Sequence, residues 1–147
     1  MPNFDPADPD FEARVRESFA RQRVMQTIGA RLKRVAPGEV DIELPFSRDL
    51  TQQHGYLHAG VVTTVVDSAC GYAALSLTPP GAEVLSVEFK INLVSPASGE
   101  LFVARARVLR AGRNITVCAG DVFAVEAARE KLSATMLATM MTVRGRD

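Results

Sequence analysis

Residues 59–82 read AGVVTTVVDSACGYAALSLTPPGA, and this stretch decides the fold. The run from Val61 to Val66 has the β-branched composition typical of a strand, whereas the length of the stretch and its small residues favour a helix. Such a helix would be apolar on nearly every side, so other structure would have to surround it. We therefore predict one long, buried helix wrapped by the rest of the chain.

Asp67 is the only charged residue between Ala59 and Ala82. A carboxylate in an apolar segment is costly to desolvate unless it has partners or a purpose. Two interpretations are open: a functional carboxylate, or a structural one bonded to backbone donors or lying at a surface. The same charge argues against a membrane span here, because spans need about 20 mainly apolar residues. No membrane partner is expected.

On both sides of this stretch the hydrophobic pattern has a period of two, which is typical of half-buried strands. Strands are predicted at residues 40–46, 86–93, 101–109, 115–125 and 132–143. Turn-forming segments at residues 110–114 and 129–131 separate the last three, which should form an antiparallel meander. The predicted fold class is therefore α+β, with a central helix inside an antiparallel sheet.

The alternation is clearest in the strand predicted at residues 86–93. One face of this strand should carry Val87, Phe89, Ile91 and Leu93, and the opposite face Ser86, Glu88, Lys90 and Asn92.

A helix is also predicted near the N-terminus. Asp10 is suited to cap its start, and Gly29 is a plausible stop. Its apolar residues recur at four-residue spacing as Phe11, Val15 and Phe19. We expect this helix and the preceding tail, residues 1–35, to pack on the main unit, residues 36–147.

The length of 147 residues suits a single domain with one core. Lys and Arg together number 17, as do Asp and Glu, so no nucleic-acid partner is expected. Cys70 and Cys118 are the only cysteines, and their spacing suggests neither a metal site nor a disulfide framework. The acidic first twenty residues do not resemble a secretory signal, so a cytoplasmic location is expected.

A polar loop, QQHGYLHAG at residues 52–60, leads directly into the predicted helix and contains both histidines. If the helix begins near Ala59, its first N–H groups point into this loop and could hold a developing oxyanion. His54 or His58 taken alone could equally be a solvated residue or a helix cap. Their clustering beside the isolated Asp67 favours a functional site.

These residues carry a resemblance to a known family. Gln52-x-His54-Gly55-x-x-His58-Ala59-Gly60 followed by Asp67 is similar to the N-x-H-G-x-x-H-G-G-x6-D signature of the PaaI branch of hotdog-fold acyl-CoA thioesterases. The similarity extends from about residue 40 to residue 143.

The resemblance implies a long helix wrapped by an antiparallel sheet of about five or six strands. It also implies a homodimer or dimer of dimers in which two subunits share each active site. The implied reaction is hydrolysis of acyl-coenzyme A thioesters, with no metal and no cofactor, since coenzyme A is part of the substrate.

By the same resemblance, Asp67 matches the carboxylate that attacks the thioester or activates water. Ala59 stands where the family has the glycine whose backbone N–H polarises the carbonyl, and Gly60 is the glycine after it. Ala59 adds a methyl group where the carbonyl should approach the backbone, so acyl-group preference or rate could differ from relatives with glycine.

Other positions match residues that hold the loop and the substrate. His58 and Gln52 correspond to residues that orient them, with Gln52 replacing the commoner asparagine. Ser86 corresponds to a hydroxyl that can hold the water or the acyl group. Arg110 and Arg113 flank a predicted turn and could pair with the phosphates of coenzyme A, or could be solvated turn charges.

The chemistry is coherent, because a thioester is electrophilic and its thiolate leaves easily, so one carboxylate and one oxyanion donor can suffice. The main alternative is a non-catalytic acyl-CoA sensor on the same fold. A transcriptional sensor would need a DNA-binding module, for which the segment before the sheet is short. A dehydratase or hydratase would arrange its His and acid differently, and the isolated Asp67 argues against a plain scaffold.

Overall fold

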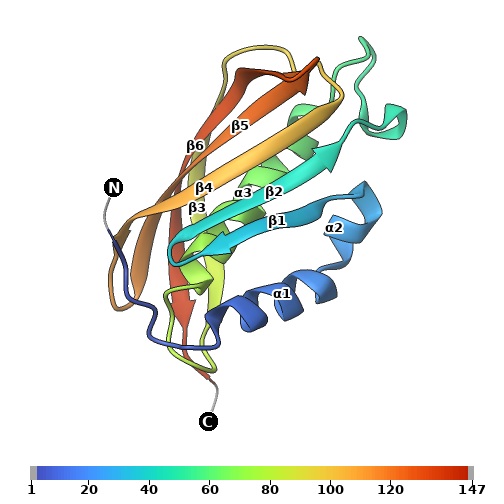
Figure 1. Ribbon diagram of the computed structural model, residues 1–147. Coiled ribbons are helices and arrows are strands. Elements are labelled where there is room, and N and C mark those ends of the chain that lie inside the picture. Colours follow the sequence, from blue (N-terminus) through green and yellow to red (C-terminus); the bar gives the residue numbers. More distant parts are fainter. Residues whose placement is uncertain (1–2, 146–147) are drawn as a thin grey trace.

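The computed structural model describes residues 3–145 and shows a curved antiparallel sheet around a long helix (Figure 1). Along the chain the elements are α1 (Phe11–Arg21), α2 (Arg23–Ile28), β1 (Arg31–Ala36), β2 (Glu39–Pro45), a 3-10 turn (Arg48–Leu50), α3 (Ala59–Leu75), β3 (Glu83–Leu93), β4 (Leu101–Ala111), β5 (Ile115–Glu126) and β6 (Arg129–Val143). None of the helices in this part of the chain has the length and hydropathy needed to cross a membrane.

The central stretch forms a helix, as predicted. α3 runs from Ala59 to Leu75, and packing of its β-branched half against the sheet overrides the strand propensity of those residues. Its buried residues are Val62, Val65, Val66, Ala69, Cys70, Tyr72, Ala73, Ala74 and Leu75. Close packing on β5 requires Gly120, because a Cβ there would lie 2.6 Å from Val66 Cγ2 and 2.9 Å from Cys70 Sγ.

The six strands are ordered β1-β2-β4-β5-β6-β3, and every neighbouring pair is antiparallel. All five predicted strands are present. β1 was not predicted, because its sequence RLKRVA lacks a clear alternation, and this edge strand pairs only with β2. Since β1 begins at Arg31, the sheet starts before residue 36.

The hairpin between β5 and β6 differs from the sequence prediction. The turn lies at Ala127 and Ala128, with φ angles of 49° and 62°, and β6 already begins at Arg129. Positive φ at both turn residues favours Gly or Asn, so turn-residue rules overlook two alanines and place the turn at the following charged residues.

The N-terminal helix is broken in two. Gln22 adopts an extended conformation between α1 and α2, whereas Gly29 ends α2 in the left-handed region, as predicted. Asp10 stands at the start of α1, but its side chain makes no capping hydrogen bond, which corrects the prediction. The carboxylate of the buried Asp8 instead accepts from the Asp10 N–H.

Arg14 fixes α1 to the far end of α3. Its guanidinium donates to the backbone oxygens of Leu75 (2.9 Å) and Pro79 (2.8 Å) and to the Asp8 carboxylate (3.0 Å). These acceptors include a carbonyl of the last turn of α3, which has no partner within the helix. α1 is thereby held against α3.

β3 contains a bulge that changes which side chains face α3. Ser86 pairs with the buried Met140, whereas Glu88 pairs with Thr139, so Val87 is the extra residue. Ser86 therefore shares the helix-facing side with Phe89, which pairs with the buried Ala138. The predicted regular alternation, with Ser86 and Glu88 on one face, is wrong at this point.

β3 is also an edge of the sheet with exposed apolar side chains. On its helix-facing side, Phe89 is 42% exposed and Leu93 is 53% exposed. Long apolar edge strands invite pairing with another chain unless something covers them.

Candidate active site

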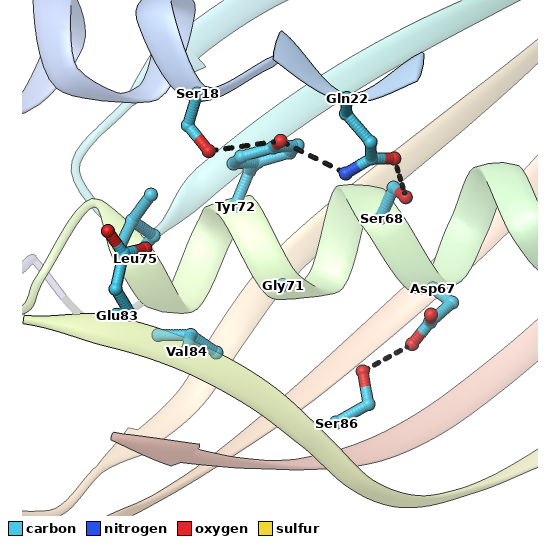
Figure 2. A pocket seen from close by; sticks show the side chains of 10 residues that line it. All are labelled: Ser18, Gln22, Asp67, Ser68, Gly71, Tyr72, Leu75, Glu83, Val84 and Ser86. Atoms are coloured by element: carbon cyan, nitrogen blue, oxygen red, sulfur yellow. Dashed lines mark hydrogen bonds between the residues drawn. The ribbon is translucent and has the colours of Figure 1, made fainter. Parts of the chain in front are cut away.

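Asp67 and Ser86 form a polar pair between α3 and β3. The Ser86 Oγ–H donates to Asp67 Oδ1 over 2.7 Å (Figure 2). Asp67 is half-buried, and within residues 3–145 no backbone N–H donates to its carboxylate. Asp67 is therefore not a structural carboxylate held by backbone donors. One of its carboxylate oxygens remains available to another partner.

The pair opens into a hollow of about 180 Å³ between α1, α3 and β3 (Figure 2). The hollow is lined by Ser18, Gln22, Asp67, Ser68, Gly71, Tyr72, Leu75, Glu83, Val84 and Ser86. Most of these side chains are polar, which is unusual for ligand pockets, since most are predominantly apolar.

One wall of the hollow is a hydrogen-bonded chain that sequence reasoning missed. The Gln22 amide donates to the Tyr72 hydroxyl (3.0 Å) and accepts from the Ser68 hydroxyl (2.8 Å), while Ser18 and Tyr72 share a hydrogen bond of 3.2 Å. We call Ser18, Gln22, Ser68 and Tyr72 the polar wall. In the sequence, the four-residue spacing of Arg14, Ser18 and Gln22 places three polar side chains on one helical face, and this pattern could have indicated the polar wall.

At the other end of α3, the loop of residues 52–58 shapes the helix start. His58 is the N-cap residue, and its Nδ1 accepts from the Gly60 N–H over 2.8 Å. His58 is thus a capping residue, one of the two alternatives left open for a lone histidine. Gln52 closes the loop, because its side-chain oxygen accepts from the His54 N–H.

The cap leaves the Ala59 N–H as the free donor. Gly60 gives its N–H to His58, and no acceptor within residues 3–145 takes the Ala59 N–H. Ala59 is exposed and is the first residue of α3, where the positive end of the helix dipole lies. This arrangement can stabilise an oxyanion.

A single chain does not bring the two halves of the site together. Asp67 is eight residues from Ala59, which corresponds to about 12 Å along the helix. Gln52, His58 and Ala59 instead border a separate hollow of about 330 Å³. The structure thus places the predicted residues in two separate groups. Asp67 lies with Ser86, and Gln52 and His58 lie with Ala59 at the start of α3.

Arg110 and Arg113 are exposed and do not border either hollow. Arg110 lies near the end of β4, where it pairs with Val117. Arg113 lies in the β4–β5 hairpin, and its carbonyl accepts from the Arg144 guanidinium over 2.8 Å. Within one chain these arginines are separate from the carboxylate.

The two cysteines offer no alternative nucleophile. Cys70 and Cys118 are both fully buried. Burial raises the pKa of Cys118 to about 12 and raises the pKa of Cys70 well above its usual value. Both are therefore thiols at neutral pH, whereas the thiolate is the reactive form.

A long helix enclosed by one antiparallel sheet is the arrangement of the hotdog fold. Residues 54–130 match the family model described as the thioesterase superfamily. The chain belongs to this superfamily, and the resemblance inferred from the signature is confirmed.

Individual relatives agree with this assignment. A thioesterase family protein from Silicibacter pomeroyi is 52% identical, with a TM-score of 0.91 over 92% of this chain and 99% of that chain. Human acyl-coenzyme A thioesterase 13 is 36% identical over 88 residues, which are 59% of this chain and 62% of the human protein. The E. coli PaaI protein shares the fold, with 16% identity and a TM-score of 0.84 over 95% and 97% of the two chains.

Proposed function

We propose that this thioesterase hydrolyses acyl-coenzyme A to a free acid and coenzyme A at sites shared between two subunits. Asp67 and Ser86 of one subunit would act on a carbonyl held by the Ala59 N–H of the other. The observation that carries this proposal is the half-buried Asp67 carboxylate, whose single partner among residues 3–145 is the Ser86 hydroxyl. The Ala59 N–H of the same helix lies too far from Asp67 to bind the same carbonyl.

The carboxylate can act in either of two ways. As a base, Asp67 takes a proton from a water molecule, the hydroxide adds to the thioester carbonyl, and the C–S bond breaks to release the thiolate. As a nucleophile, Asp67 adds to the carbonyl itself, the C–S bond breaks to release the thiolate, and water then hydrolyses the resulting anhydride to the free acid and the Asp67 carboxyl group. Ser86, which donates to Asp67 Oδ1, leaves the second carboxylate oxygen for the water or the carbonyl.

The carbonyl oxygen becomes negatively charged in the transition state. We expect the Ala59 N–H to donate to it, because a helix N-terminus presents free donors whatever the side chain. His58 and Gln52 would act indirectly: His58 fixes Gly60 and the helix start, and Gln52 closes the loop that precedes it.

The second copy is expected to pair along β3. This strand is an edge, and its helix-facing side exposes Phe89 and Leu93 beside an open main-chain ladder. A two-fold axis next to β3 would extend the sheet, cover these side chains and create two equivalent sites. A homodimer, alone or paired as a dimer of dimers, satisfies this expectation.

Arg110 and Arg113 remain candidates for the phosphates of coenzyme A. Both are exposed, and neither forms an ion pair with a carboxylate of residues 3–145. Guanidinium groups suit phosphates because they donate in pairs. A cytoplasmic location, where acyl-coenzyme A thioesters would be available, also belongs to this proposal.

The alternative is an acyl-CoA sensor without catalysis. Release of free thiol and acid should be followed with acetyl-, butanoyl-, hexanoyl-, benzoyl- and dodecanoyl-coenzyme A, alongside calorimetric binding of the same compounds. We expect equimolar acid and coenzyme A from at least one compound. Binding without turnover would favour the sensor, and neither binding nor turnover would reject both functions.

A further inference from the structure

The proposed chemistry does not say which part of the substrate occupies the hollow beside Asp67. We infer that it holds the acyl group, and that Gly71 and the polar wall select a compact acyl group bearing an uncharged oxygen substituent. This inference rests on the proposed thioester hydrolysis and adds the substrate class.

The charge of the hollow decides which half of the substrate enters it. Asp67 and Glu83 both border the hollow, and none of the ten residues that line it is basic. The phosphates of coenzyme A would be repelled there, so the acyl half is the part that fits. An acyl group with its own carboxylate would be repelled for the same reason.

The size of the hollow sets the size of the acyl group. Its volume of about 180 Å³ is slightly larger than a cavity of about 150 Å³ that accommodates benzene. The space exists because residue 71 is a glycine one turn after Asp67, in the middle of α3 (Figure 2). A Cβ at Gly71 would meet nothing within 4 Å and would point into open space.

The polar wall supplies a donor. Gln22 donates to Tyr72 and accepts from Ser68, and one hydrogen bond joins Ser18 to Tyr72. That last bond uses only one of the two hydroxyl hydrogens, so either Ser18 or Tyr72 keeps a hydrogen with no acceptor in residues 3–145. An oxygen on the acyl group can accept it, whereas a plain hydrocarbon would displace water from this donor and leave it unpaired.

The polar wall is also held in place, as selection requires. Tyr72 is only 6% exposed, and α1, which carries Ser18, is fixed to α3 by Arg14. Side chains locked by packing and by further hydrogen bonds discriminate better than mobile ones.

The test compares kcat/KM for two pairs of substrates that differ by one hydroxyl: hexanoyl- against 6-hydroxyhexanoyl-coenzyme A, and benzoyl- against 4-hydroxybenzoyl-coenzyme A. The wild-type protein should prefer the hydroxylated member of at least one pair. Tyr72→Phe should reduce that preference about tenfold, which is the effect of losing one neutral hydrogen bond. Glu17→Ala, on the exposed side of α1, is the matched control and should keep the wild-type ratio.

Gly71→Ala provides a second, independent variant that does not threaten folding. Its methyl group should lower the ratio of kcat/KM for benzoyl- over acetyl-coenzyme A at least about tenfold, since the acyl group loses room, while the melting temperature stays the same or rises. Wild-type hydrolysis with no hydroxyl preference, or an unchanged ratio in Gly71→Ala, would overturn the inference and leave the proposed function standing. No hydrolysis of any acyl-coenzyme A would overturn both.

Discussion

The carboxylate of Asp67 is the residue on which the chemistry depends. It is half-buried and has a hydroxyl as its only partner among the described residues, so replacement should affect reactivity more than folding. Asp67→Asn keeps the shape and can still bond to Ser86, but it cannot act as base or nucleophile. We expect kcat to fall at least about 100-fold, with an unchanged unfolding midpoint. Near-normal turnover would remove Asp67 from the mechanism.

The Ala59 N–H can be removed without disturbing the helix. Ala59 is the first residue of α3, where proline is tolerated, and His58 has φ −61° and ψ 137°, which suits a residue before proline. Ala59→Pro should therefore fold normally and lose about 100- to 1000-fold in kcat, as expected for an oxyanion donor.

Ala59→Gly is the control for that variant, because it keeps the N–H. Its kcat should stay within about tenfold of wild type, and bulkier acyl groups should be accepted better. Equal losses in both variants would show that the geometry of the loop, and not the N–H, is what matters.

The sequence indicated Asp67 because one charge in a long apolar segment needs an explanation, and it indicated the helix start through the loop glycines and histidines. The family resemblance placed Ser86 in the site, but the strand periodicity could not indicate that Ser86 faces Asp67. A strict period of two places Ser86 with Glu88, and only the bulge at Val87 reverses it. The polar wall was missed because α1 lies over α3 through contacts 46 to 54 residues apart in the chain.

At the scale of elements, α3 and β5 are brought together by Gly120. A methyl group there would lie 2.6 Å from Val66 Cγ2, so Gly120→Ala should lower the free energy of unfolding by about 1–3 kcal/mol. Gly71→Ala on the facing helix meets no atom and should raise it by about 0.5–1 kcal/mol. Urea denaturation of both variants measures the difference, and shifts of the same sign would contradict this packing.

Arg14 should contribute more to stability than a neighbouring arginine on the same helix. Arg14→Ala removes the guanidinium that binds the Leu75 and Pro79 carbonyls and the buried Asp8 carboxylate, which should cost about 2 kcal/mol or more. Arg16 forms only an exposed pair with Glu12, so Arg16→Ala should cost about 0.5 kcal/mol or less. Hydrogen exchange in α1 should accelerate in the first variant alone.

Element types were predictable where a pattern repeats over many residues, as in the strands that became β2 to β6. They were less predictable where tertiary contacts determine whether a segment forms a helix, a strand or a break. The break at Gln22 has no proline or glycine to announce it, and its side chain is engaged with Ser68 and Tyr72. β1 depends on pairing with β2 and not on its own composition.

At the scale of the whole molecule, the described chain has half-sites and an uncovered edge. Among residues 3–145, the Ala59 N–H and one oxygen of the Asp67 carboxylate have no hydrogen-bond partner, and apolar side chains of β3 are exposed. Assembly of two copies would satisfy all three at once. The central claim is therefore that each site takes Asp67 from one subunit and the Ala59 N–H from another.

The most direct test is complementation between inactive subunits. Two differently tagged chains, one with Asp67→Asn and one with Ala59→Pro, are co-expressed, and assemblies carrying both tags are purified. If sites are shared, each mixed dimer contains one doubly altered site and one intact site, so it should recover about half of the wild-type turnover per dimer. If each chain carries its own complete site, the mixed assemblies will be as inactive as either variant alone, and the account will be wrong.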